Sequence, residues 1–232
     1  MRKRGWILAT FVIAAFVAVS LAQTPVQTPV QTSAQTQAQT PAPKPAPKPA
    51  SPEGTAATQI GGKYVDVSGR QRYQDGKWVE VTYGRPILRQ RQNIFGSGAD
   101  YGKTISAGSP VWRAGANLTT KLKTEVPLVF DGKTLPAGEY DVFVELKENA
   151  WTLVFSTWPA QVKYDPKNKE ALWGSYGYTP DKDVLRAPMK VETLPFSMDQ
   201  FTIAFVDVTA DGGKLAMMWD KTIATAPFKA GN

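Results

Sequence analysis

Four arginines stand in stretches of the sequence that are otherwise apolar or aromatic. They are Arg85, Arg91, Arg113 and Arg186. A guanidinium stays protonated in proteins and carries five N–H donors, so burying it without a partner costs free energy. Each of these arginines is therefore expected to bond either another group of the protein or a ligand.

Two interpretations of the arginines remain open from the sequence. In the first, they pair inside the protein with Asp183, Asp207 or Glu80, which sets the register of the fold more than it adds stability. In the second, two or three guanidiniums converge on a concave face, where their planar forks accept a carboxylate or a phosphate. Stacking walls would then come from four aromatic residues: Trp112, Trp173, Tyr176 and Tyr178.

The second interpretation defines a set of candidate ligand-binding residues. The set consists of Tyr83, Arg85, Arg91, Trp112, Arg113, Asn117, Trp173, Tyr176, Asp183 and Arg186. The expected partner is a small anionic or carbohydrate ligand, because guanidiniums bind anions and aromatic rings stack on flat apolar faces.

The residue types that the chain lacks exclude several chemistries. It contains no His and no Cys, which excludes Ser-His-Asp and Cys-His nucleophiles and zinc sites built on imidazole or thiolate. No cofactor and no metal site is predicted. A hydrolase acting on envelope glycans would need a pair of carboxylates, and its candidates are Glu139, Glu145, Asp181 and Asp183. Their spacing does not single out an acid and a base.

The stretch WRAGAN, residues 112–117, combines three candidates with a flexible joint. Gly115 lets the backbone bend and approach another strand closely. Trp112 is expected to pack this corner, and the Asn117 side chain can bond backbone groups that the bend leaves free.

The alternation of apolar and polar residues predicts that β-strands position these candidates. Strands are expected at 62–68, 77–84, 117–130, 140–146, 151–157, 170–178, 187–193, 200–208, 214–220 and 222–227. Hairpin turns are expected at Asp75-Gly76, Asp131-Gly132 and Asp211–Gly213. The sequence thus predicts an all-β fold: a single antiparallel β-sandwich or barrel-like domain, in its most specific form jelly-roll-like.

The N-terminal part of the chain is expected to lie outside this domain. Residues 1–22 have the basic start, apolar run and small residues before a cleavage site that are typical of a signal peptide. Residues 23–56 are rich in Gln, Thr, Pro, Ala and Lys and are predicted to form a disordered linker. The domain is then 57–232, exported to the periplasm or outside the cell. An uncleaved anchor is the alternative, but the apolar run is shorter than the roughly 20 residues that span a bilayer.

The net charge of the chain is +7, and more than half of it comes from residues before Ala57. The domain is therefore only mildly basic and lacks the dense positive surface of a nucleic-acid-binding protein. No nucleic acid is expected as a partner, and no membrane span is expected after cleavage of the signal peptide. The sequence gives no prediction of the oligomeric state.

Several short motifs follow one another in an order that is specific when taken together. They are Tyr83 with Arg85-Pro86, Arg91 with Ile94-Phe95-Gly96, Tyr101-Gly102, Trp112-Arg113 with Gly115-Ala116-Asn117, Leu135-Pro136-Ala137-Gly138 with Tyr140, Trp151, Trp173-Gly174 with Tyr176 and Tyr178, and Asp183 with Arg186. With these motifs the chain resembles the bacterial domain-of-unknown-function 2911 family (DUF2911), over roughly residues 57–228.

The resemblance implies a secreted, β-rich protein without an established activity. The chain departs from the family pattern at residues 104–110, where TISAGSP is inserted between Tyr101-Gly102-Lys103 and Trp112. This insertion is expected to move Tyr101 away from Trp112.

Three functions agree with the residues. The first is a non-catalytic binding module of the cell envelope with an arginine and aromatic pocket. The second is the carboxylate-dependent hydrolase, and the third is a purely structural envelope protein.

Overall fold

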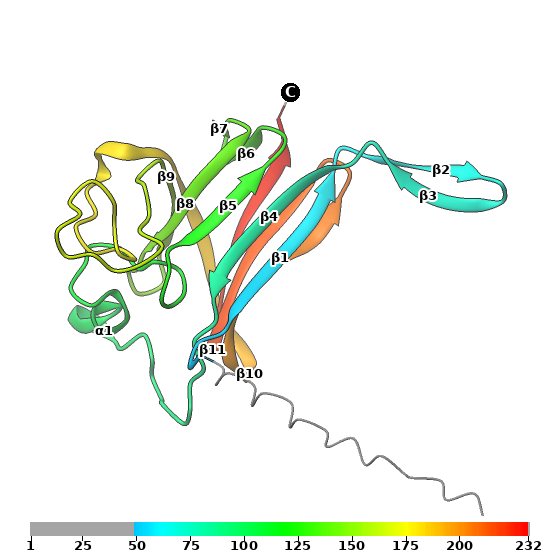
Figure 1. Cartoon of the computed structure of the whole chain (residues 1–232). Helices are drawn as coiled ribbons and strands as arrows, with labels where there is room; N and C mark the ends of the chain where they lie inside the picture. The colour runs from blue at the N-terminus through cyan, green and yellow to red at the C-terminus, as the bar shows by residue number, and fades with distance from the viewer. Residues whose placement is uncertain (1–48, 232) are drawn as a thin grey trace, which may run out of the picture. The chain divides into compact units, whose positions relative to one another are not determined.

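The computed structural model describes residues 49–231, which form eleven strands with little helix (Figure 1). In chain order the elements are β1 (Glu53–Ile60), β2 (Lys63–Val67), β3 (Arg70–Gln74), β4 (Lys77–Gly84), the 3-10 turn η1 (Gly98–Asp100), the helical turn α1 (Lys103–Ser106), β5 (Thr120–Thr124), β6 (Leu128–Phe130), β7 (Lys133–Leu135), β8 (Gly138–Glu145), β9 (Trp151–Ser156), the 3-10 turn η2 (Pro180–Lys182), β10 (Asp183–Thr209) and β11 (Gly212–Ala230). No helix in this part of the chain has the length and apolarity needed to cross a membrane.

Nine of the strands form one antiparallel sheet in the order β1-β4-β5-β8-β9-β10-β11-β6-β7, and β2 and β3 form a separate hairpin. The long strand β10 pairs with β9 near its start and with β11 further along, so the sheet folds over on itself without closing into a barrel. The prediction of a single antiparallel all-β domain is confirmed. The order is simpler than that of a jelly roll. The strands of the sheet lie side by side in chain order, as in a meander, except that the β6–β7 hairpin lies beyond β11.

The N-terminal boundary of the domain differs from the predicted one. β1 begins at Glu53 and pairs with β4 from Glu53↔Gly84 to Ile60↔Lys77, so the sheet starts before the predicted boundary at residue 57. The small residues of β1 gave little alternation in the sequence, and pairing with β4 decides its conformation. The predicted signal peptide and the predicted linker up to residue 48 lie outside the described residues.

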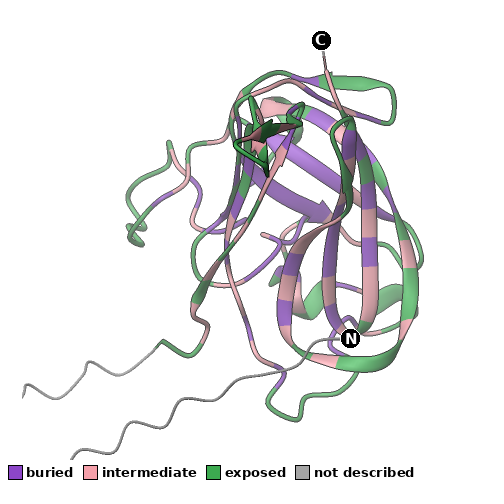
Figure 2. Cartoon of the chain, turned by 90° about the vertical axis from the view of Figure 1, so that its right-hand side faces the viewer, coloured by how far each residue is buried: buried purple, intermediate pink, exposed green. Residues whose placement is uncertain are grey.

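The core lies inside the folded sheet and is built by strict alternation along the strands. On β4, Val79, Val81 and Tyr83 are buried while their neighbours are more exposed. Strands β8 and β9 are buried on both faces (Figure 2), because the segment 157–182 covers their outer side. There Phe143 and Val154 form a second, smaller core. The outer segment therefore has an apolar base that holds it on the sheet.

The segment 157–182 contains the main error in the predicted strands. A strand was predicted at 170–178, but this stretch forms turns and isolated bridges between Ala160 and Leu172 and between Trp173 and Tyr176. Gly174 and Gly177 both have positive φ, which breaks an extended strand.

Two long strands replace the four predicted at 187–193, 200–208, 214–220 and 222–227. Their pairing shifts register where β10 bulges between Thr193 and Met198 and again near Thr209. Asp207 has φ 52° and bonds Lys214 at 2.7 Å on the surface. The interpretation that Asp207 pairs with a buried arginine is therefore wrong.

Of the three predicted hairpin turns, one is wrong. Asp131-Gly132 joins the paired strands β6 and β7, and Asp211 lies in the turn between β10 and β11. Asp75-Gly76, however, joins β3 to β4, which do not pair; β3 pairs with β2 through a turn at Ser68-Gly69. The β2–β3 hairpin projects from the sheet as an arm (Figure 1).

Candidate functional site

Of the four predicted arginines, Arg113 has the fewest hydrogen-bond partners within the described residues. Its Nη1 donates to the carbonyl oxygen of Asn117 at 2.8 Å. This is the only hydrogen bond of the guanidinium within residues 49–231, and no carboxylate there pairs with it. Burial lowers the pKa of Arg113 from its ordinary value. A half-buried cation with unused donors is the electrostatic feature that an anion would complement.

The position of Arg113 depends on a glycine in the outer segment. The guanidinium lies against Gly174, and a Cβ at that position would overlap it. Gly174 also has φ 62°, a conformation that favours glycine. Trp173 and Ser175, on either side of Gly174, are thereby brought to the same place as Arg113.

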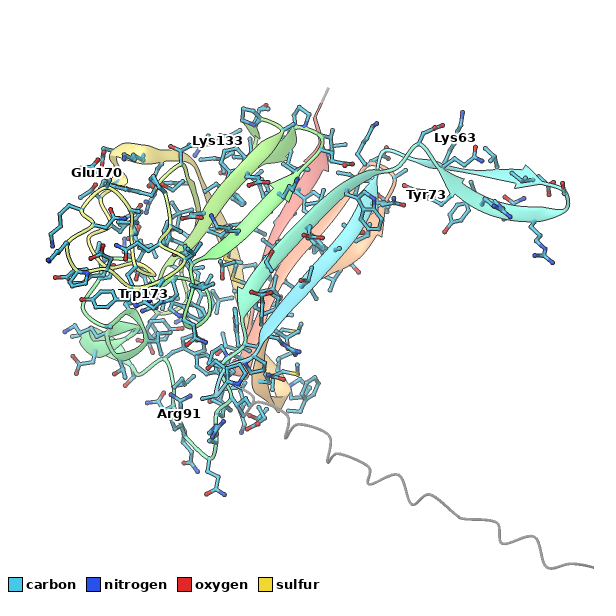
Figure 3. The ribbon with its side chains drawn as sticks, viewed as in Figure 1. Lys63, Tyr73, Arg91, Lys133, Glu170 and Trp173 are labelled. Atoms are coloured by element: carbon cyan, nitrogen blue, oxygen red, sulfur yellow. The ribbon has the colours of Figure 1, made fainter. Side chains whose placement is uncertain are left out.

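Arg113 lines a cleft of about 490 Å³, which we call the aromatic cleft. Its lining combines rings, hydroxyls and one cation: Ser106, Ala107, Gly108, Ser109, Pro110, Arg113, Tyr164, Trp173, Ser175, Tyr176, Gly177 and Tyr178. Tyr176 is 74% exposed, and Tyr164 packs on Trp173 with ring centroids 5.7 Å apart. Trp173 lies on the outer segment, beside α1 (Figure 3). The rings form a wall on which a ligand can stack.

Arg113 also borders a smaller cleft of about 240 Å³, the Arg91 cleft, with Arg91, Trp112, Asn117 and Trp219. Arg91 donates to the carbonyls of Leu88 and Ile87 at 2.9 and 2.8 Å, and its guanidinium lies 5.7 Å from the Trp219 ring centroid. No acidic residue lines this cleft, so it is a positive depression beside the aromatic cleft.

Arg186 is paired inside the protein, as the first interpretation predicts. Its Nη1 donates to Asp183 at 2.7 Å, and its Nη2 to Glu145. The Tyr178 hydroxyl donates to the same Asp183 carboxylate at 2.6 Å, and burial together with that carboxylate raises the pKa of Tyr178. The hydrogen bond from Lys147 lowers the pKa of Glu145, and the positive charges of Lys147 and Arg186 lower it further. These groups satisfy one another and leave no charge for a ligand.

Tyr83 and Arg85 also have structural roles. The Tyr83 hydroxyl accepts from the Ile203 amide at 2.9 Å and donates to its carbonyl at 3.2 Å. Arg85 donates to the Phe201 carbonyl and the Thr202 hydroxyl at 3.3 and 3.2 Å. Both residues tie the end of β4 to β10.

The WRAGAN stretch forms the predicted corner. A Cβ at Gly84 would overlap the carbonyl oxygen of Ala116, and one at Gly115 would lie 2.7 Å from the Gly84 oxygen. Trp112 is buried and its Nε1 donates to Gly115 at 3.0 Å. Asn117 Nδ2 donates to the Ser51 carbonyl at 3.0 Å.

Tyr101 is separated from Trp112 by the ring of Phe95. Phe95 lies between the two residues, stacked on Tyr101 at 6.1 Å and edge-on to Trp112 at 6.2 Å. The inserted residues form α1 and the turn after it, and they line the aromatic cleft through Ser106 and Ser109.

The structure thus divides the predicted site. It brings Arg113, Trp173 and Tyr176 together in one cleft, and Arg91, Trp112 and Asn117 together with Arg113 in the next. Tyr83, Arg85, Asp183 and Arg186 line neither cleft. Tyr164 and the serines of the aromatic cleft were not predicted. Their only sequence signal is that they lie in loops rich in Gly, Pro and Asn.

The carboxylates proposed for a hydrolase bond other groups of the protein. Asp183 and Glu145 share Arg186, Glu139 is exposed beside Lys123, and Asp181 accepts from Thr179. None of them lines the aromatic cleft or the Arg91 cleft. Among the described residues, no three acidic side chains converge on a point where a metal ion could bind.

One carboxylate is buried with only half of its oxygens bonded. Asp141 on β8 accepts from Lys121 Nζ at 2.8 Å through Oδ1, while Oδ2 has no partner in the described structure. Burial raises the pKa of Asp141, and Lys121 opposes part of the rise. The folded pKa of Asp141 lies above the unfolded value of about 3.8. The protonated carboxyl therefore stabilises the folded protein at low pH, and this contribution to the free energy of unfolding is lost as pH rises through the folded pKa.

Asp141→Asn is therefore expected to gain stability relative to the natural protein as pH rises from about 4 to 7. Urea unfolding at several pH values measures this difference. Glu145→Gln is the opposite control: because the folded pKa of Glu145 lies below the unfolded value of 4.5, that variant should lose relative stability as pH rises through the folded pKa to about 5, and little above it. A difference for Asp141→Asn that stays flat or falls with pH would contradict the assignment.

Comparison with known proteins gives one match. A family model described as "Protein of unknown function (DUF2911)" matches residues 65–228. No curated protein and no solved structure matches the chain. The matched range contains the aromatic cleft, the Arg91 cleft and the Arg186 pair. Because the match covers most of the described residues, the chain belongs to the DUF2911 family.

Proposed function

We propose that the protein is a non-catalytic, exported binding module of the cell envelope that holds an anionic, sugar-like ligand in the aromatic cleft. The observation that carries this proposal is Arg113, a half-buried guanidinium without a carboxylate partner in the described residues. It lines a cleft beside the exposed ring of Tyr176.

The two halves of the cleft lining suit two parts of such a ligand. Arg113 supplies a planar fork for a carboxylate or phosphate group. Tyr164, Trp173 and Tyr176 supply ring faces for the apolar face of a sugar ring. Ser109 is held by the Ser175 carbonyl at 2.8 Å, which fixes its hydroxyl at the edge of the cleft. A uronic acid or a sugar phosphate combines these features.

Binding by Arg113 should be separable from folding. Arg113→Gln removes a charge that burial already disfavours, so the free energy of unfolding should change by less than about 1 kcal/mol. The loss of a charge-assisted contact should weaken binding by about tenfold or more.

The test is calorimetric titration of the full chain with glucuronate, galacturonate and glucose 6-phosphate, with glucose as the uncharged comparison. At least one anionic probe should bind more tightly than glucose and raise the melting temperature. Arg70→Gln, on the β2–β3 arm and outside both clefts, is the matched control and should bind normally. Equal affinity of Arg113→Gln and Arg70→Gln, or no binding of any anionic probe at millimolar concentration, would overturn the proposal.

A further inference from the structure

A further cleft lies at the base of the β2–β3 arm, and Arg113 is not part of its lining. We call it the arm cleft; its volume is about 410 Å³, and it is lined by Gln59, Tyr64, Tyr73, Trp78, Val208, Thr209 and Ala210. It therefore joins side chains of β1, β2, β3 and β4 to the end of β10 and the turn that follows it. None of these lining residues carries a charge at neutral pH.

Strand pairing puts two of the three aromatic rings of this cleft next to each other and places the third beside an amide. Tyr64 and Tyr73 are directly opposite each other in the β2–β3 pair, and their ring centroids are 5.1 Å apart at 61°. Trp78 is opposite Gln59 in the β1–β4 pair. Residues opposite each other across antiparallel strands point to the same face, so each ring has a polar or aromatic neighbour.

The same parity places the basic residues of the arm on its other face, while Asp66 lies on the face of Tyr64 and Tyr73, outside the lining of the cleft. Lys63, Arg70 and Arg72 alternate with Tyr64, Gln71 and Tyr73 along the two strands. Figure 3 shows Lys63 and Tyr73 pointing away from opposite sides of the arm. The aromatic face is thus separated from the basic face by the thickness of one strand pair.

The base of the cleft is held in place, while its rims are open. The Tyr73 hydroxyl accepts from the Gly62 amide at 3.0 Å, and its ring fills the space next to Gly62 and Gly76. Tyr64 is 71% exposed and Trp78 is 49% exposed. A fixed ring flanked by two exposed rings is a preformed platform, which lowers the entropy cost of binding.

We propose that the arm cleft binds an uncharged glycan chain. The CH face of a pyranose stacks on aromatic rings. Its hydroxyls bond amides, and the Gln59 amide, which has no partner among the described residues, offers two donors and one acceptor beside Trp78. The absence of charge from the lining distinguishes this occupant from an anionic one. The site does not depend on Arg113 or on the aromatic cleft.

The test is calorimetric titration of the full chain with cellohexaose and chitohexaose, with trigalacturonate as the anionic comparison. At least one uncharged hexasaccharide should bind, and Trp78→Ala should weaken it by about tenfold, the upper value for one aromatic stacking contact. Tyr64→Ala should weaken it in the same direction. Phe196→Ala, which removes an exposed ring of β10 outside this cleft, is the matched control.

Four outcomes would overturn the proposal. The first is that neither hexasaccharide binds at millimolar concentration, and the second is that Trp78→Ala and Phe196→Ala bind equally well. The third is a preference for trigalacturonate that Trp78→Ala removes. The fourth is a change of oligomeric state by Trp78→Ala in sedimentation without any effect on sugar, which would assign the cleft to contact with a second copy. Arg113→Gln should leave hexasaccharide binding unchanged, so failure here is distinct from failure at the aromatic cleft.

Discussion

Trp112→Ala is expected to lower the free energy of unfolding by about 3–5 kcal/mol, the range for truncating a buried tryptophan. Trp112 is one of the largest fully buried side chains of the described structure. Its ring contacts Phe95, Trp151, Phe201 and Trp219 with centroids 4.9–6.3 Å apart. Truncation removes these contacts and leaves a cavity that strands β8 and β10 cannot collapse to fill.

Urea unfolding monitored by circular dichroism measures the loss, which corresponds to a fall in melting temperature of about 10 °C. Trp112→Phe keeps a ring in the site and loses the indole bond to Gly115, so it should lose roughly 1–2 kcal/mol. Tyr64→Ala removes an aromatic ring that is largely in water and should change stability by less than about 0.5 kcal/mol. A loss for Trp112→Ala no larger than that of Tyr64→Ala would contradict the role of Trp112 as the centre of the core.

The position of Trp112 illustrates what the sequence could predict. A glycine three residues after a large aromatic residue, just before a predicted strand, indicates a bend that needs packing, and this inference uses only residues close in sequence. The alternation of β4 was predictable for the same reason, because Val79, Val81 and Tyr83 show their burial by parity alone. Local patterns of this kind predicted the all-β class correctly.

The assignment of the arginines could not be predicted, because it depends on residues that are distant in sequence. Arg113 and Arg186 are both surrounded by apolar and aromatic residues. Register places Arg186 beside Val154 of β9 and Glu145 beside Thr152, which brings Glu145 to Arg186 in addition to Asp183, three residues earlier on the same strand. Arg113 is instead covered by the outer segment at Gly174, where no carboxylate is close. The fold of that segment, wrongly predicted as a strand at 170–178, is what decides the difference.

This difference gives the last prediction, that Arg186→Gln destabilises the protein by about 1–3 kcal/mol whereas Arg113→Gln does not. Removing one partner of a buried ion pair typically costs about 3–5 kcal/mol, because the other charge stays buried without compensation. The Asp183 side chain is 7% exposed, but that of Arg186 is 35% exposed. Water can therefore enter and replace part of the lost interaction, which reduces the expected cost. Glu145 keeps Lys147 at 2.8 Å, so the cost arises mainly at Asp183.

A double-mutant cycle isolates this cost. Asp183→Asn alone should also destabilise, and the double variant should recover part of the loss, giving a coupling energy of at least about 1 kcal/mol between Asp183 and Arg186. Glu139→Gln, at an exposed pair with Lys123, should change stability by less than about 0.5 kcal/mol. If Arg186→Gln and Arg113→Gln lose equal stability, the two guanidiniums are not distinguished by their partners. Arg113 would then be a structural residue, and the aromatic cleft would lack the free cation that an anionic ligand requires.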